Sequence, residues 1–133
     1  MKKVWTCLWV DREAEEMAHF YNQVFENVTV GEYSYYPKSA EKVSGKKENS
    51  ILSIDLRIEN LNLQILNAGP VFKANPSFSF MLFCSSADEI KSKWHKLSSE
   101  GVVRMELAPY PWASLYGWTV DKFGVEWQLI EAP

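Results

Sequence analysis

The sequence is poor in the side chains that most often hold structural metals and disulfide bonds. Its 133 residues include only two cysteines and two histidines. Cys7 and Cys84 each lie in an apolar, strand-like run, where cysteine usually behaves as a small hydrophobic residue. His19 and His95 lie in runs with helical spacing, where they flank the apolar positions. The sequence therefore favours neither a structural disulfide nor a histidine-rich zinc site.

Two further absences narrow the function. The formal net charge is only −3 and no long basic run occurs, which argues against a general nucleic-acid-binding protein. The apolar run at residues 4–10 follows Met1-Lys2-Lys3 and is far shorter than the roughly 20 residues of a membrane helix. It is also too short for a signal-peptide core with its cleavage site. We therefore expect a cytoplasmic protein whose partners include neither nucleic acid nor membrane.

The sequence does contain enough apolar material for one core. Apolar residues make up 47% of the chain and aromatic residues 14%, and the length suits a single domain over residues 1–133. Runs rich in β-branched and aromatic residues predict a series of strands. The predicted strands cover residues 4–10, 28–36, 51–58, 61–66, 78–84, 102–107, 116–120 and 125–130.

Two stretches between these strands have helical spacing. In the first, Asp11 is a plausible N-cap and the helix ends near residues 26–27. The second covers residues 86–97 and ends before Gly101, the favoured type of residue just after a helix. Residues 37–50 form a polar segment that is long for a plain connection, which makes it a candidate mobile flap. Residues 71–76 are expected to be a linker and residues 108–115 a loop.

The order of elements occurs twice, and the two halves also match in sequence. Residues 14–17 (AEEM) match residues 87–90 (ADEI), at the start of each helix. Residues 63–68 (LQILNA) resemble residues 127–132 (WQLIEA), at the end of each half. Two matches in the same order indicate a duplicated β-α-β-β-β module, with modules at approximately 1–70 and 77–133. One helix covers one face of such a sheet, so the open faces of two modules can enclose a ligand cavity.

The run at residues 112–128 (WASLYGWTVDKFGVEWQ) resembles the C-terminal signature of PhnB-like proteins, as residues 8–11 (LWVD) and 67–70 (NAGP) resemble other parts of that family. The family belongs to the glyoxalase/bleomycin-resistance/dioxygenase, or vicinal-oxygen-chelate, superfamily. The resemblance implies an α+β fold of two tandem β-α-β-β-β modules whose curved mixed sheet surrounds a cavity. It also implies a homodimer. Some relatives carry a demethylubiquinone-methyltransferase label, but no glycine-rich loop joins a strand to a helix here, as a nucleotide-type cofactor would require.

Metal-using members of the superfamily hold a divalent ion with four side chains. By resemblance, these positions are Trp5, Gln64, Ser79 and Gln128 here. Divalent ions prefer carboxylate oxygen or imidazole nitrogen, whereas indole offers no useful lone pair and amides and hydroxyls carry no charge. We therefore expect no metal and no other cofactor at this site.

Strand alternation suggests which side chains line the cavity instead. Cys7 and Trp9 share a face with Trp5, Met81 shares one with Ser79, and Trp118 lies within the C-terminal signature. The predicted ligand-binding residues are Trp5, Cys7, Trp9, Gln64, Ser79, Met81, Trp118 and Gln128. Such a neutral lining suits a small apolar or aromatic molecule. Alternatively, these side chains fill the cavity as core, and Gln64 and Gln128 bond to each other or to the backbone.

Catalysis is left open by the sequence. Glu126 is the candidate general base if it is buried, and an exposed strand carboxylate near Lys122 if it is not. Cys7 has no evident base beside it that would make it a nucleophile. Three functions compete: a metal-free binding module, a metal-dependent or acid–base enzyme (isomerase, lyase, dioxygenase or thiol transferase), and a protein that sequesters an antibiotic.

Overall fold

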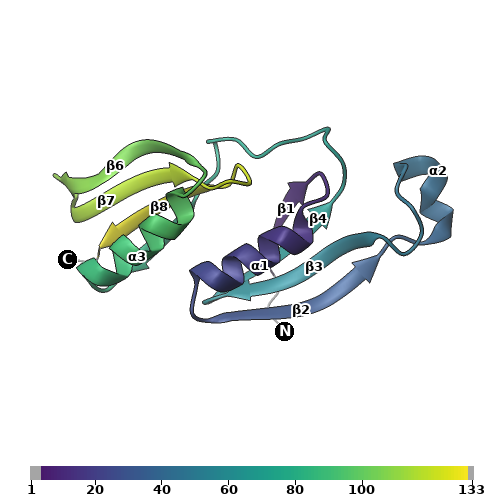
Figure 1. Ribbon diagram of the computed structural model, residues 1–133, viewed down its shortest axis with the longest axis horizontal. Helices are drawn as coiled ribbons and strands as arrows, with labels where there is room; N and C mark the ends of the chain where they lie inside the picture. The colour runs from purple at the N-terminus through teal and green to yellow at the C-terminus, as the bar shows by residue number, and fades with distance from the viewer. Residues whose placement is uncertain (1–3, 132–133) are drawn as a thin grey trace. The chain divides into compact units, whose positions relative to one another are not determined.

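The computed structural model describes residues 4–131, in two compact units, Met1–Lys73 and Ala74–Pro133. Each unit has the predicted β-α-β-β-β order and folds into its own four-stranded mixed sheet (Figure 1). The expectations for Met1-Lys2-Lys3 and for Ala132 of the repeat lie outside the described residues. Among residues 4–131, no helix has the length and apolar character needed to cross a membrane. The predicted α+β class with two tandem modules is confirmed.

The first unit contains the strands and main helix of residues 6–67. Its sheet has the order β1-β4-β3-β2, in which β1 and β4 are parallel and the other neighbours antiparallel. The elements are β1 (Thr6–Val10), α1 (Ala14–Val24), β2 (Val28–Tyr35), β3 (Ile51–Ile58) and β4 (Leu61–Asn67), with the short helical turns η1 (Lys38–Ala40) and α2 (Glu41–Ser44) between β2 and β3.

The second unit repeats this topology without the short turns. Its sheet has the order β5-β8-β7-β6, again with the outer pair β5 and β8 parallel. The elements are β5 (Phe80–Cys84), α3 (Ala87–Ser98), β6 (Val102–Tyr110), β7 (Ala113–Val120) and β8 (Glu126–Glu131).

Strand register supports the internal repeat. Cys7 lies beside Gln64 in the first sheet, and Met81 lies beside Gln128 in the second. The two glutamines therefore occupy equivalent places. Trp5 lies two residues before Cys7, and Ser79 lies two residues before Met81. This spacing supports the equivalence of Trp5 and Ser79 that the family resemblance implies.

One helix covers one face of each sheet. In the first unit, Met17 and Tyr21 of α1 are fully buried with Ile54, Leu63 and Ile65 of the sheet. In the second unit, Ile90 and Leu97 of α3 are buried with Leu129.

The packing of α3 depends on a glycine. A Cβ at Gly117 would lie 2.5 Å from the ring of Trp94, so only a residue without a side chain lets the helix approach this closely. The opposite face of each sheet carries no helix of its own unit. We call it the helix-free face.

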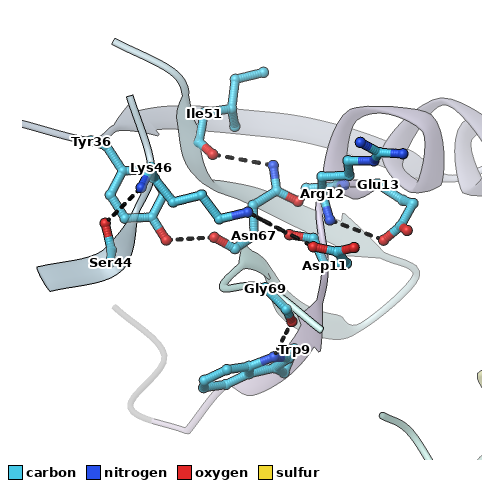
Figure 2. A network of polar contacts seen from close by, with 11 residues as sticks. Trp9, Asp11, Arg12, Glu13, Tyr36, Ser44, Lys46, Ile51, Asn67 and Gly69 are labelled. Atoms are coloured by element: carbon cyan, nitrogen blue, oxygen red, sulfur yellow. Dashed lines mark hydrogen bonds and ion pairs between the residues drawn. The ribbon is translucent and has the colours of Figure 1, made fainter. Parts of the chain in front are cut away.

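The start of α1 differs from the prediction. Glu13, not Asp11, is the N-cap residue, and its side chain caps no helical N–H. The buried Asn67 of β4 supplies this contact instead: its Oδ1 accepts from the Ala14 N–H at 2.9 Å. The Nδ2 of Asn67 donates to the Ile51 carbonyl at 3.1 Å, and its own carbonyl accepts from the Tyr36 hydroxyl (Figure 2). One asparagine thus joins the helix start, β3 and the entrance to the 37–50 segment.

The 37–50 segment is not a plain loop. It contains the short turns η1 and α2, and its base is closed by backbone hydrogen bonds between Tyr36 and Ser50 and between Asn49 and Tyr36. Lys46 Nζ donates to the Asp11 carbonyl at 3.2 Å (Figure 2). Mobility of the segment stays a prediction.

Two local predictions in the second unit are wrong. Residues 108–115 do not form a loop, because β6 and β7 extend through them and turn between Tyr110 and Ala113. Gly101 is also not the residue that caps α3: the C-cap is Ser99, and Glu100 is the residue with a positive φ, of 60°. Gly101 is needed for space, because a Cβ there would collide with the Val120 carbonyl oxygen.

We expect Asn67→Ala to destabilise the protein, because it leaves the Ala14 N–H and the Ile51 carbonyl without their partner. Losing a buried partner of this kind costs about 1–3 kcal/mol. Denaturant unfolding measures the change, with Asn62→Ala on the same strand as a half-buried control. An equal loss in both variants would contradict the role assigned to Asn67.

Candidate functional site

The predicted site residues of the first unit lie at or near the helix-free face of its sheet. Cys7 is exposed and sits beside Gln64, whose Nε2 donates to Asp55 Oδ1 at 3.1 Å. Trp9 donates its ring N–H to the Gly69 carbonyl at 2.8 Å. Trp5 directly precedes β1 and is 44% exposed. The structure therefore brings Cys7 and Gln64 together and adds a carboxylate beside them.

Asp55 was missed in the sequence, although its pattern is visible there. Ser53, Asp55 and Arg57 alternate along β3 with buried Ile54, Leu56 and Ile58. A strict alternation of this kind marks a polar face. Asp55 thus adds a carboxylate beside Gln64, where only neutral side chains were expected.

The second unit gathers its predicted residues more closely. Met81, Gln128 and Trp118 lie side by side across β5, β8 and β7. Gln128 uses both ends of its amide: Oε1 accepts from the Tyr116 hydroxyl at 2.6 Å, and Nε2 donates to Ser79 Oγ at 2.8 Å. Each glutamine thus bonds to side chains of its own sheet, Gln64 to Asp55 and Gln128 to Tyr116 and Ser79.

Glu126 lies next to this row and is only 3% exposed. Arg104 binds its carboxylate with two hydrogen bonds, Nε to Oε1 at 2.7 Å and Nη2 to Oε2 at 2.9 Å. Trp118 donates its ring N–H to the same Oε1 at 2.9 Å. The guanidinium also lies over the Trp118 ring, 5.5 Å from the centroid. A buried carboxylate is tolerated only with such partners, and the hydrogen bond to Glu126 raises the pKa of Arg104.

The sequence alternative for Glu126, an exposed carboxylate near Lys122, is wrong. Lys122 pairs instead with Glu100, at 3.8 Å. Arg104 was missed because β6 is irregular there: Val103 pairs with Thr119 and Met105 with Trp118, so Arg104 is the extra residue of a bulge. The helix-free face of this unit thus carries an ion pair, which the expectation of neutral ligand-binding residues did not include.

The residues at the superfamily's metal positions do not fit a divalent ion. Gln64 and Gln128 offer only neutral amide oxygens, and Gln128 Oε1 already accepts a hydrogen bond from the Tyr116 hydroxyl, so neither supplies the negative charge that a divalent ion prefers. Across residues 4–131, no three histidine, cysteine, aspartate or glutamate side chains gather where they could hold an ion. His19 and His95 are exposed on α1 and α3, as expected of flanking residues.

An aromatic cluster borders the helix-free face of the second unit at the β6–β7 turn. The rings of Tyr110 and Trp112 stack with centroids 5.0 Å apart, and Trp112 meets Tyr116 edge-on at 5.4 Å. Tyr116 is the residue that binds Gln128, so this cluster is continuous with the site. Tyr110 and Trp112 lie in the 108–115 segment that was expected to be a loop, so these ring contacts were not predicted.

Comparison with known proteins agrees with this architecture. A family model described as 3-demethylubiquinone-9 3-methyltransferase matches residues 2–130. A PhnB protein from Bacillus cereus is 28% identical, with a TM-score of 0.87 over 98% of this chain and 100% of that one. A protein from Pseudomonas aeruginosa is 22% identical, with a TM-score of 0.80 over 98% of each chain.

More distant structures share the fold alone. The fosfomycin resistance protein FosX from Listeria monocytogenes is 9% identical, with a TM-score of 0.68 over 100% of this chain and 94% of that one. Together with the sheet topology, this similarity confirms the vicinal-oxygen-chelate fold. No curated protein matches the sequence.

The two thiols give a test of the site's electrostatics. Burial and the neighbouring Glu89 raise the pKa of Cys84 to about 12, and desolvation raises the pKa of the exposed Cys7 as well. A raised pKa leaves less thiolate at a given pH, and the thiolate is the reactive form. At pH 8 we expect Cys7 to react with Ellman's reagent more slowly than free cysteine does. The rate of the Cys7 reaction should increase as the pH is raised. Cys84 should not react in the folded protein.

Cys7→Ser is the matching control. The folded variant should then show no reactive thiol, whereas the denatured variant should show one reactive thiol, that of Cys84. Rapid labelling of the folded Cys7→Ser variant would contradict the burial of Cys84.

Proposed function

We propose, from the premise that this chain belongs to the 3-demethylubiquinone-9 3-methyltransferase family, that it binds a small apolar or aromatic molecule without using a metal ion. The family membership places it among PhnB-like proteins with the vicinal-oxygen-chelate fold. The ligand would lie on the helix-free face of the Ala74–Pro133 unit.

The observation that carries this proposal is the exposed apolar surface of β5. Met81 is 50% exposed and Phe83 64% exposed, whereas the alternating Phe80 and Cys84 are buried on the side of α3. Half-buried Trp118 lies two strands from Met81 in the same row. Contiguous exposed apolar side chains are typical of binding surfaces, because covering them with another apolar surface is favourable.

Polar groups beside this surface are held in fixed positions. Gln128 is oriented by Tyr116 and Ser79, so its amide retains one further N–H and one further lone pair in a defined direction. A few oriented polar groups within an apolar surface are the usual composition of a small-molecule site.

Acid–base catalysis by Glu126 is not part of the proposal. Both of its oxygens accept hydrogen bonds from Arg104, and Oε1 accepts a second from Trp118. A general base needs to reach a substrate proton, and this carboxylate is 3% exposed. Its geometry suits holding Arg104 and Trp118 in place.

Methyl transfer is also not carried over from the family's description. The connections from β1 to α1 and from β5 to α3 are Asp11-Arg12-Glu13 and Ser85-Ser86, and neither contains glycine. A nucleotide-type cofactor approaches such a connection closely and needs glycine there.

Binding of methyl 2-naphthoate, a flat neutral probe, tests the proposal by titration calorimetry. We expect saturable binding that is unchanged by EDTA, and an affinity about tenfold or more lower in Phe83→Ser, because a covered phenylalanine contributes about 1.5–3 kcal/mol. Phe72→Ser is the matched control, since Phe72 is 63% exposed but belongs to the other unit.

Absence of saturable binding in the wild-type protein would overturn the proposal. Equal losses in Phe83→Ser and Phe72→Ser would remove the helix-free face of the second unit as the site. Loss of binding in EDTA, restored by a divalent metal, would overturn the metal-free part.

A further inference from the structure

The guanidinium of Arg104 has one edge that the protein leaves available. An arginine carries five N–H groups, and Glu126 takes only two of them, on Nε and Nη2. Within residues 4–131, no hydrogen bond involves the two N–H groups of Nη1. The edge formed by Nη1 and the second N–H of Nη2 is thus a two-pronged donor. With the side chain 36% exposed, a ligand can reach it.

The position of this donor is fixed before any ligand arrives. Glu126 is buried and binds the other edge of the guanidinium with two hydrogen bonds, and Trp118 lies beneath it. The same carboxylate holds the Trp118 ring through its N–H. A donor that is already oriented loses less conformational entropy on binding, so it contributes more to affinity.

We propose that the ligand of this face is an apolar or aromatic organic acid whose carboxylate binds the free edge of Arg104; this inference rests on the proposed function above. Two parallel N–H groups match the two oxygens of a carboxylate. The apolar body of the acid would lie against Trp118, Met81 and Phe83, which share this face.

The distribution of charge in the unit favours a singly charged acid over a polyanion. The lysines of the second unit lie elsewhere: Lys91, Lys93 and Lys96 on α3, and Lys122 in the turn before β8. Arg104 is therefore the cation that the described part of this face offers, and Glu126 already offsets much of its charge. One carboxylate suits such a site, whereas a multiply charged group needs several cations.

The test compares 2-naphthoate with methyl 2-naphthoate, which has the same ring system but no charge. In the wild-type protein we expect the acid to bind about tenfold or more tightly than the ester, as hydrogen bonds to charged groups are the stronger kind. Its affinity should fall as salt is raised, while that of the ester should not.

Arg104→Lys separates the free edge from the ion pair. Lysine keeps a positive charge beside Glu126 but has no second edge to offer a ligand. We expect the acid to lose its advantage in this variant and the ester to bind as before. Arg57→Lys, an exposed arginine on β3 of the other unit, is the matched control and should change neither affinity.

The outcomes distinguish this inference from the proposed function. If acid and ester bind the wild-type protein equally, or if Arg104→Lys keeps the preference for the acid, the inference is wrong and the apolar site stands. If neither probe binds, the proposed function fails and the inference fails with it. The wild-type comparison and its salt dependence decide the matter even if Arg104→Lys does not fold.

Discussion

A four-stranded sheet has two faces, and each unit of this protein supplies one helix to cover only one of them. The covered faces contain the cores, with Tyr21 of α1 and Ile90 of α3 fully buried. The polar pairs Gln64–Asp55 and Gln128–Ser79 are excluded from those cores and lie on the helix-free faces. Strand alternation places Cys7, Gln64, Met81 and Gln128 on these faces. Trp5 and Ser79 directly precede their strands, and a bulge in β6 positions Arg104.

On the helix-free face of the second unit, a buried carboxylate organises its neighbours. Burying Glu126 without partners would be costly, and the bulge in β6 places Arg104 where it can bind both oxygens. The same carboxylate fixes the Trp118 ring, and the ring supports the guanidinium. The result is a fixed cationic donor beside exposed Met81 and Phe83, a combination that suits recognition better than proton transfer.

Much of the fold was predictable because it depends on periodicity and repetition. Local patterns predict the polar and apolar alternation of β3 and the helical spacing of Ala14, Met17 and Tyr21. The internal repeat is visible in the match of residues 63–68 with residues 127–132. The partners of the site were less predictable. Arg104 meets Glu126 only because a bulge changes the register, and Asn67 caps α1 from 53 positions along the chain. Such contacts depend on tertiary geometry, which a single sequence does not display, so Glu126 was found as a candidate while its burial and its partner were not.

The central claim is that the helix-free face of the second unit, and not the core, meets the ligand. Carbon-13 labelling of the methionine methyl groups tests it directly, because Met81 is exposed on that face and Met17 is fully buried under α1. Titration with 2-naphthoate should shift the Met81 methyl resonance, through the ring current of the bound probe, and leave that of Met17 in place. A saturable titration in which the Met81 resonance does not move would contradict the account.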